Sequence, residues 1–366
     1  MIVVAGQTLP LQRLTPEMDQ AFIDLYGAFF GASVIDWTKF EAVAARFFAG
    51  SNIGPQHHDS FFNNFATVWH RWLQSGQLAQ AEELWELALR PAFAWEAGGL
   101  GCRVHKGTPY YFWGMTAILR GDLDKGYALM HQAVEEDVLT HSQESPDTPA
   151  FAFATLNAIK PDQAFRGWLL EQAQYLSSLL DRYRQTTGRS LDFNGFQQRF
   201  LAKGTNRDAS FLLAHAIARL MKIGIIPEYA RDSHFASQLQ VQVLFDVTLV
   251  IDAAIRPHNQ PEWKFIKHAT LLAQRANLGL SESQLGEVNR LFEGDFAGSL
   301  NGFLDERITL TDGLVPKDLA RDVCVTYGLR NYGAHHVESA TTLPRRFAEG
   351  VQRVFNVLFL CVEIFH

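Results

Sequence analysis

The sequence predicts an all-α protein, and three observations lead to this fold class. Apolar residues recur at spacings of three and four along nearly the whole chain, which is the period of an amphipathic helix. No stretch alternates apolar and polar residues convincingly, as a half-buried strand would. Hydrophobic residues make up 47% of the 366 residues and charged residues 19%, so the chain can bury a core, and its length favours more than one domain.

The first region expected to fold together spans residues 1–139 and contains two helical pairs. The first pair is FFNNFATVWHRWLQSGQLAQAEELWELALRP, in which Gly76 lies at the turn and Pro91 marks the end of the second helix. The second pair is YYFWGMTAILRGDLDKGYALMHQAVEED, with Gly121 at its turn. Aligned on these glycines, the copies place small and large residues at matching positions: Ala81, Trp85 and Ala88 opposite Gly126, Met130 and Ala133.

These two pairs resemble tetratricopeptide repeats. Small residues at such positions let neighbouring helices approach closely while the large residue fills the groove between them, and Gly114 matches the small residue of the family's first helix. An insert at residues 92–108 makes the spacing longer than in the family. The resemblance implies a tetratricopeptide-like helical array that acts as a regulatory region or binds a protein partner.

The rest of the chain is expected to contain a linker, a middle region and a C-terminal bundle. Residues 140–149 are polar, include two prolines and are expected to be the linker. Residues 150–236 have helical patterns but no motif that indicates a function. Residues 237–366 are expected to form a four- or five-helix bundle. Its predicted helices span residues 240–255, 262–278, 294–306, 317–334 and 344–365.

The last predicted helix is apolar on nearly every side from Val354 to Phe365. A small bundle has little room to bury such a helix, so we expect a homodimer interface through the C-terminal bundle to cover it. The alternative is that this helix lies at the centre of a monomeric helical array.

Arg330 occupies an unusual position in the helix predicted after Pro316. It falls near the middle of an apolar stripe that includes Leu319, Val323, Thr326 and Tyr327. A guanidinium cannot lose its charge, and burying it without partners is costly. Two explanations follow. Either Arg330 forms a buried ion pair, for which the acidic candidates are Asp246, Asp252 and Glu363, or it faces a cleft in which it binds a phosphate.

His335 follows five residues later, where Gly333 and the polar residues beyond it indicate that the helix ends. An imidazole there can both donate and accept protons near neutral pH. Asn331 supplies a short polar side chain that can orient either partner. A fixed cation, a proton-transfer group and a positioning amide are sufficient for RNA cleavage by the substrate's own 2′-hydroxyl, without a metal or other cofactor.

The segment Arg330-Asn331-Tyr332-Gly333-Ala334-His335 resembles the motif of the HEPN superfamily, at the end of a helix in a C-terminal bundle. The resemblance covers residues 237–366 and implies an endoribonuclease, commonly of toxin–antitoxin or antiviral defence systems, that dimerises so that two motifs share one cleft. It implies that Arg330 and His335 are catalytic and that Asn331 supports them. An acidic residue of an earlier helix commonly completes such a site, with Asp252 or Asp246 as candidates.

The second histidine of the motif leaves one assignment open. His336 also satisfies the family's spacing, and His335 is preferred because Ala334 precedes it. The net charge of −7 means that RNA must be bound by a local basic patch, for which Arg345, Arg346 and Arg353 are candidates. The alternative for Arg345-Arg346 is a solvated surface pair.

Other features limit the classes of protein that fit. Three scattered cysteines make a disulfide framework or zinc cluster improbable, and His57-His58-Asp59 is interpreted as surface residues with no metal site. The N-terminus lacks the features of a secretory signal, and no stretch is predicted to cross a membrane, so we expect a cytoplasmic protein. The alternative to a ribonuclease is a non-catalytic dimeric helical scaffold in which Arg330 is a structural ion-pair residue.

Overall fold

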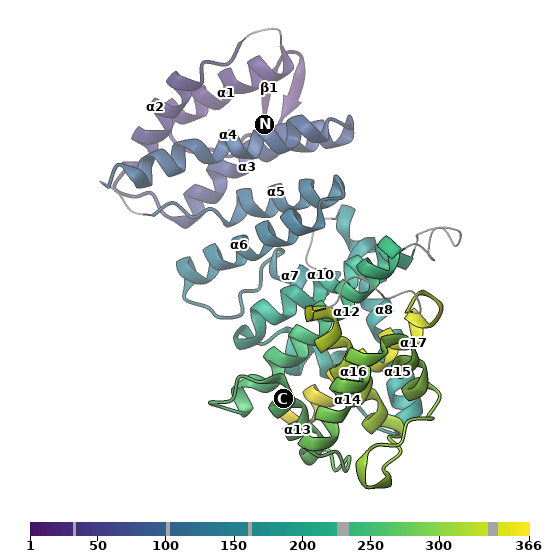
Figure 1. The fold of residues 1–366 in the computed structure, drawn as a ribbon. Helices are drawn as coiled ribbons and strands as arrows, with labels where there is room; N and C mark the ends of the chain where they lie inside the picture. The colour runs from purple at the N-terminus through teal and green to yellow at the C-terminus, as the bar shows by residue number, and fades with distance from the viewer. Residues whose placement is uncertain (32–33, 100–102, 160–162, 225–233, 336–342) are drawn as a thin grey trace. The chain divides into compact units, whose positions relative to one another are not determined.

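The computed structural model describes residues 1–31, 34–99, 103–159, 163–224, 234–335 and 343–366 (Figure 1). Helices account for most of this part of the chain, which confirms the all-α prediction. The chain divides into two compact units, Met1–Phe151 and Ala152–His366. Each unit has its own buried core, and each is described in turn below.

A short β-hairpin at the N-terminus departs from the all-α expectation. Strands β1 (Ile2–Val4) and β2 (Gln7–Leu9) pair antiparallel, with Ile2 opposite Leu9. Ala5 and Gly6 between them have φ angles of 50° and 75°, as a tight two-residue hairpin turn requires. Strands of three residues are too short to give a convincing alternating pattern, which is why the sequence did not predict them.

The helices of the N-terminal unit include those predicted on both sides of the turns at Gly76 and Gly121. They are α1 (Pro16–Phe30), α2 (Trp37–Phe48), α3 (Pro55–Gln74), α4 (Leu78–Ala97), α5 (Gly107–Leu119) and α6 (Leu123–His141). The prediction that the second helix ends at Pro91 was wrong, because α4 continues through this proline to Ala97. Edge-to-face contacts join Phe22 to Phe61 and Phe65 in the core between α1 and α3.

Helices α5 and α6 cross where two glycines meet. A Cβ atom on Gly126 would lie 2.4 Å from Cγ1 of Ile118, and one on Gly114 would lie 3.0 Å from the carbonyl oxygen of Gly126. A larger residue at Gly126 would therefore force the two helices apart. Gly114 and Gly126, which the resemblance to tetratricopeptide repeats placed at small positions, thus allow the two helices to approach closely.

The C-terminal unit contains the remaining elements. They are α7 (Phe151–Thr155), α8 (Gln163–Thr187), α9 (Phe193–Phe196), the π-helical turn η1 (Gln197–Leu201), η2 (Gly204–Asn206), α10 (Arg207–Gly224), α12 (His234–Ile255), η3 (Arg256–His258), α13 (Phe265–Arg275), α14 (Glu282–Gly294), α15 (Phe296–Leu304), η4 (Thr311–Gly313), α16 (Asp318–His335) and α17 (Leu343–Phe365). Helix α14 was not predicted. The helix expected at 262–278 is shorter than predicted and spans Phe265–Arg275.

Helix α17 lies at the centre of this unit. Helices α8, α12 and α16 all pack against it, and residues 354–362 are buried throughout. The apolar final helix is therefore covered by its own chain, so its composition no longer requires a second copy. Since α8 contacts α17 and α10 contacts α12, the middle region expected at 150–236 contributes to the same compact unit as the bundle.

One helical stretch, Phe235–His258, is long and apolar enough to cross a membrane, with a mean hydropathy of 1.4. In the structure 61% of its apolar window is buried against neighbouring helices. That burial is typical of a core helix in a soluble protein.

Candidate functional site

Arg330 lies on α16, one turn and a half before the helix ends, and its side chain is half-buried. Leu319, Val323, Thr326 and Tyr327 are buried, but so is every other residue from Leu319 to Leu329, so this helix is covered on all sides and shows no separate apolar stripe. The guanidinium carbon lies 5.2 Å from the centre of the Phe265 ring of α13. The Nε atom is buried and has no hydrogen-bond partner among the described residues. Arg330 was predicted near the middle of an apolar stripe, but the structure places its cation where the buried stretch of α16 ends, against an aromatic ring.

The three acids expected as partners of Arg330 are each engaged elsewhere. Asp246 pairs with Arg219 at 2.6 Å. Asp252 lies 2.6 Å from Nδ1 of His268 and also pairs with Arg256. Glu363 pairs with Arg189 at 2.8 Å and accepts a hydrogen bond from Tyr183. None of these three acids forms an ion pair with Arg330, so the structural ion pair expected for Arg330 is not formed with them.

Asn331 instead connects Arg330 to helix α14. Its Nδ2 donates a 2.6 Å hydrogen bond to Oδ1 of Asn289, which leaves its Oδ1 to accept a 3.4 Å contact from Nη1 of Arg330. Nδ2 of Asn289 in turn donates to Glu293 at 2.7 Å. This chain of contacts fixes which way each amide points. Asn331 is therefore in contact with both the guanidinium of Arg330 and the side chain of Asn289.

The sequence analysis missed Asn289 and Glu293 because it did not identify their helix. A signal for α14 was present: Ser281 and Gln284 form a capping box, in which the serine caps the helix and Oε1 of Gln284 accepts from the Ser281 backbone N–H at 2.9 Å. Identifying that box would have placed Asn289 and Glu293 one turn apart on one face of a helix.

The remaining motif residues are placed only in part. His335 is the last residue of α16, as predicted for a group near a helix end, but its side chain lies outside the described part of the structure. His336 lies outside the described residues altogether. Along a helix, five residues correspond to about 7.5 Å of rise and about 500° of rotation, so the positions of Arg330 and His335 lie about 140° apart around the axis of α16.

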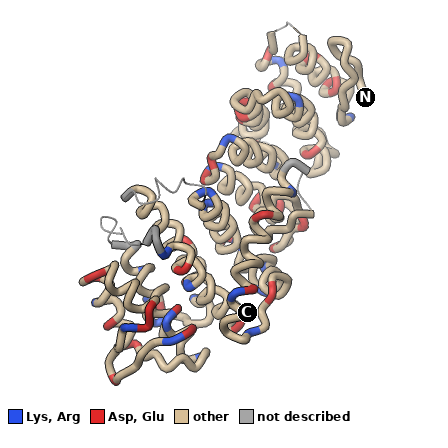
Figure 2. The backbone as a smooth tube through the Cα atoms, turned by 90° about the vertical axis from the view of Figure 1, so that its right-hand side faces the viewer, with Lys and Arg blue, Asp and Glu red and all other residues tan. Residues whose placement is uncertain are grey.

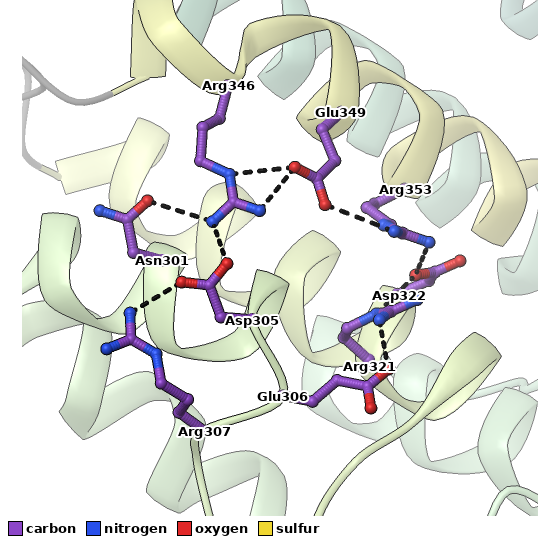
Figure 3. A network of polar contacts seen from close by, with 9 residues as sticks. All are labelled: Asn301, Asp305, Glu306, Arg307, Arg321, Asp322, Arg346, Glu349 and Arg353. Carbon is purple, nitrogen blue, oxygen red and sulfur yellow. Dashed lines mark hydrogen bonds and ion pairs between the residues drawn. The ribbon is translucent and has the colours of Figure 1, made fainter.

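A network of ion pairs connects α15, α16 and α17 and includes two of the basic residues expected to bind RNA (Figure 3). Arg346 pairs with Asp305 and with Glu349, both at 2.7 Å. Arg353 pairs with Glu349 and, at 3.3 Å, with Asp322. Arg346 and Arg353 thus each form ion pairs with carboxylates of the same chain in this structure. Arg345 belongs to α17, but its side chain lies outside the described part.

The acid at the centre of this network, Asp322, is buried on α16. Burial raises the pKa of its carboxyl, and the neighbouring Arg353 and a hydrogen bond from Asn356 oppose this effect. Asp322 thus links the motif helix to α17, eight residues before Arg330. Acidic and basic residues are interspersed along the C-terminal unit (Figure 2), in keeping with the absence of a basic excess in the whole chain.

A second polar cluster lies in the N-terminal unit, and it corrects the interpretation of His58 as a surface residue. His58 is buried, and its Nδ1 accepts the backbone N–H of His105 at 3.0 Å. The ring of His105 lies between two carboxylates, with Nδ1 3.1 Å from Asp59 and Nε2 3.0 Å from Asp137. The sequence gave no sign of this cluster because His105 and Asp137 are far from His58 along the chain.

The two buried histidines of this cluster have opposite pKa shifts. Burial lowers the pKa of His58 to about 4, and the nearby His105 contributes to the effect. Burial also disfavours the charged form of His105, but hydrogen bonds to Asp137 and Asp59 outweigh it and raise the pKa of His105 to about 9. Among the described residues, His105, Asp137 and His141 are close enough together to hold a metal ion.

No protein-family model, curated protein or solved structure matches this chain.

Proposed function

We propose that the protein is a metal-independent endoribonuclease of the HEPN type, with Arg330 and His335 as catalytic residues and Asn331 as a positioning residue. The observation that carries the proposal is the state of Arg330. Its guanidinium is oriented by Asn331, and no carboxylate among the described residues neutralises it. A cation held in this way is available to a phosphate, which it can bind through two parallel N–H groups.

The reaction that these groups suit is transfer of the phosphoryl group within the RNA chain. The 2′-hydroxyl oxygen attacks the adjacent phosphorus, the bond from phosphorus to the 5′-oxygen breaks, and a 2′,3′-cyclic phosphate and a 5′-hydroxyl form. Arg330 would stabilise the negative charge that grows on the phosphate oxygens. His335 would take the proton from the 2′-hydroxyl or give one to the leaving oxygen.

A homodimer through the C-terminal bundle remains part of the proposal, because two motifs in one cleft would supply two imidazoles for these two proton transfers. This dimer is supported by the family resemblance, and the buried α17 does not argue for it. Asp252 or Asp246 is still proposed as the acid that completes the site, as the resemblance implies, and both also pair with an arginine in the structure. A role in toxin–antitoxin or antiviral defence and regulation through the tetratricopeptide-like N-terminal helices follow from the resemblances and are proposed on that basis. A cytoplasmic location is proposed from the features of the sequence.

Cleavage of RNA by the purified full-length protein tests the mechanism directly. In the presence of a chelator, wild-type protein should cut RNA to products with a 2′,3′-cyclic phosphate, and Arg330→Ala and His335→Ala should not. The matched control is Arg290→Ala, which removes an exposed arginine from the neighbouring helix α14 and should retain activity. Cleavage that survives both motif substitutions, or that stops when the chelator is added, would refute the proposal.

One observation favours the second candidate function, a non-catalytic dimeric helical scaffold. The contact of Arg330 with the Phe265 ring is one that a purely structural arginine also makes. On this alternative, Arg330→Ala should lower the melting temperature strongly or change the oligomeric state, and wild-type protein should not cleave RNA. A thermal melt and a sizing experiment on this variant distinguish the two functions.

A further inference from the structure

The buried cluster around His105 has the composition and spacing of a metal site. His105 lies just before α5, while Asp137 and His141 lie four residues apart on α6, so that both point from the same face of that helix. One ligand atom from each of the three residues lies within 4.8 Å of the others. Two imidazoles and a carboxylate are common ligands of transition metals in proteins.

The distances need only a small adjustment to hold an ion. Ligand atoms around a tetrahedral Zn²⁺ are about 3.3 Å apart. Nε2 of His105 and Oδ1 of Asp137 are already 3.0 Å apart. His141 is exposed and is the last residue of α6, so its side chain can turn toward the other two without disturbing the core. Its ring is 5.6 Å from that of His105, measured between ring centres.

Asp59 supplies the support that a ligating histidine usually has. It lies 3.1 Å from Nδ1 of His105, on the side of the ring away from Asp137, and its Oδ1 also accepts a 2.8 Å hydrogen bond from the Thr108 hydroxyl. Histidines that bind metals through one nitrogen typically donate the other N–H to a carboxylate, which sets the tautomer and the direction of the ring. This arrangement leaves Nε2 of His105 directed at Asp137.

The charges of the cluster also fit a divalent ion. Two carboxylates, those of Asp59 and Asp137, converge on a single imidazole. A proton shared between Nε2 and Asp137 gives one positive charge against two negative ones, whereas a divalent ion would balance both. The buried ammonium of Lys106 does not add to this balance, because Glu96 holds it at 2.6 Å.

Space for the ion and for a further ligand is present beside these residues. A Cβ atom on Gly107 would lie 2.8 Å from both Oδ1 of Asp137 and Nε2 of His105, so only glycine keeps this approach open. The cluster borders a pocket of about 330 Å³, which Asn63, Tyr111 and Thr148 also line. The hydroxyl of Thr148 is buried there without a hydrogen-bond partner among the described residues.

We propose that His105, Asp137 and His141 bind a divalent transition metal ion, for which Zn²⁺ is the best fit, with a fourth position open to the pocket. On binding, the ion replaces the proton between His105 and Asp137, which passes to solvent. The open position would take water or a small anionic ligand. The site lies entirely in the N-terminal unit, and it does not depend on the ribonuclease proposal.

Titration of the chelator-treated full-length protein with ZnCl₂, followed by calorimetry, tests this proposal. We expect saturable binding of one ion per chain and a melting temperature that rises with the concentration of free Zn²⁺. His141→Ala should weaken binding by more than about 100-fold, since it removes a ligand, and should fold because the residue is exposed. Asp59→Asn, which changes only the support of His105, should weaken binding by about 10- to 100-fold.

The matched control is His70→Ala, which removes an exposed histidine of α3 and should bind Zn²⁺ as the wild type does. Asp137→Asn provides a second ligand variant of nearly unchanged shape. The proposal is wrong if wild-type protein shows no saturable binding, or if His141→Ala and Asp137→Asn bind as tightly as the control. None of these measurements uses RNA cleavage, so their outcome is separate from that of the ribonuclease assay.

Discussion

Asn331 of the motif helix donates a 2.6 Å hydrogen bond to Asn289 of helix α14, and this contact sets the direction in which the Asn331 carbonyl oxygen faces Arg330. The side-chain amide of Asn289 in turn donates a hydrogen bond to the carboxylate of Glu293, one turn later on α14. The orientation of the guanidinium is therefore controlled from a helix that carries no part of the sequence motif.

Substitution of Asn289 is expected to impair RNA cleavage without abolishing it. In Asn289→Ala, the amide of Asn331 loses its partner and can rotate, so that Arg330 is no longer held in one direction. Misplacement of a positioning group costs on the order of 10- to 100-fold in rate. Single-turnover cleavage at saturating enzyme should show the loss in the rate constant of the chemical step, while RNA affinity changes little.

The control for this measurement is Asn194→Ala, which removes an exposed asparagine of α9. Its cleavage rate should equal that of the wild type. If Asn289→Ala cleaves as fast as this control, Asn331 does not orient Arg330 in the active protein.

We expect Arg330→Ala to lose activity but little stability, and Arg353→Ala to lose stability but keep its activity. Arg330 contacts the ring of Phe265, a kind of contact worth about 1 kcal/mol, so Arg330→Ala should lower the free energy of unfolding by about that amount and abolish cleavage. Arg353→Ala removes a cation from the buried Asp322 and should cost about 3 kcal/mol. Urea denaturation at pH 7, followed by tryptophan fluorescence, measures both.

Arg353→Ala should retain cleavage at temperatures where it stays folded, because Arg353 has no contact with the motif residues among those described. A larger loss of stability in Arg330→Ala than in Arg353→Ala would indicate that Arg330 holds the fold together, as the scaffold alternative requires.

Periodicity predicted much of the fold, because a helix leaves its mark within a short stretch of sequence. The helices around Gly76 and Gly121 and the helix that contains Arg330 were predicted from their local pattern alone. The same pattern does not say what covers a helix. The apolar α17 was therefore interpreted as a dimer interface, with the centre of a monomeric array as the alternative, and the pattern did not indicate that α8, a helix far away in the sequence, packs against it.

The partners of charged residues could not be predicted for the same reason. Asp252 and Arg330 both lie on apolar helices, which made an ion pair between them a reasonable hypothesis. In the structure Asp252 pairs instead with Arg256, four residues later, and with His268. The contact with His268 depends on the packing of α13 against α12. His58 and Asp59 were likewise judged from their neighbours in the sequence, whereas His105 contacts them from the segment that precedes α5.

Arg346 is expected to stabilise the charged form of Asp305 rather than to bind RNA. Its hydrogen bond is the main reason that the pKa of the Asp305 carboxyl lies below 3.8, and Arg307 contributes less. A lowered pKa means that this pair stabilises the fold above about pH 4 and that the effect is lost as the pH falls through the pKa of the folded state. In Arg346→Ala, the pKa of Asp305 should return most of the way to 3.8, as measured by carbon-detected NMR titration.

The same variant tests whether Arg346 contributes to RNA affinity. Because its guanidinium is held by Asp305 and Glu349, Arg346→Ala should leave the Kd for RNA within about twofold and the salt dependence of binding unchanged. A weaker salt dependence would show that Arg346 leaves its carboxylates to contact a phosphate.

The crossing of α5 and α6 provides a test of the close helix approach in the N-terminal unit. Gly126→Ala would place a Cβ atom 2.4 Å from Ile118 and 3.2 Å from the Gly114 carbonyl oxygen, so the helices must separate. Overpacking of this kind costs about 1–3 kcal/mol.

The matched control is Gly27→Ala in α1, where a Cβ atom would meet nothing within 4 Å. That change should stabilise the helix by about 0.5–1 kcal/mol, because alanine loses less backbone entropy on folding. Chemical denaturation of both variants should therefore give shifts of opposite sign. If Gly126→Ala is neutral, α5 and α6 can separate at no cost, and the small residues aligned in the two helical pairs do not determine how these helices pack.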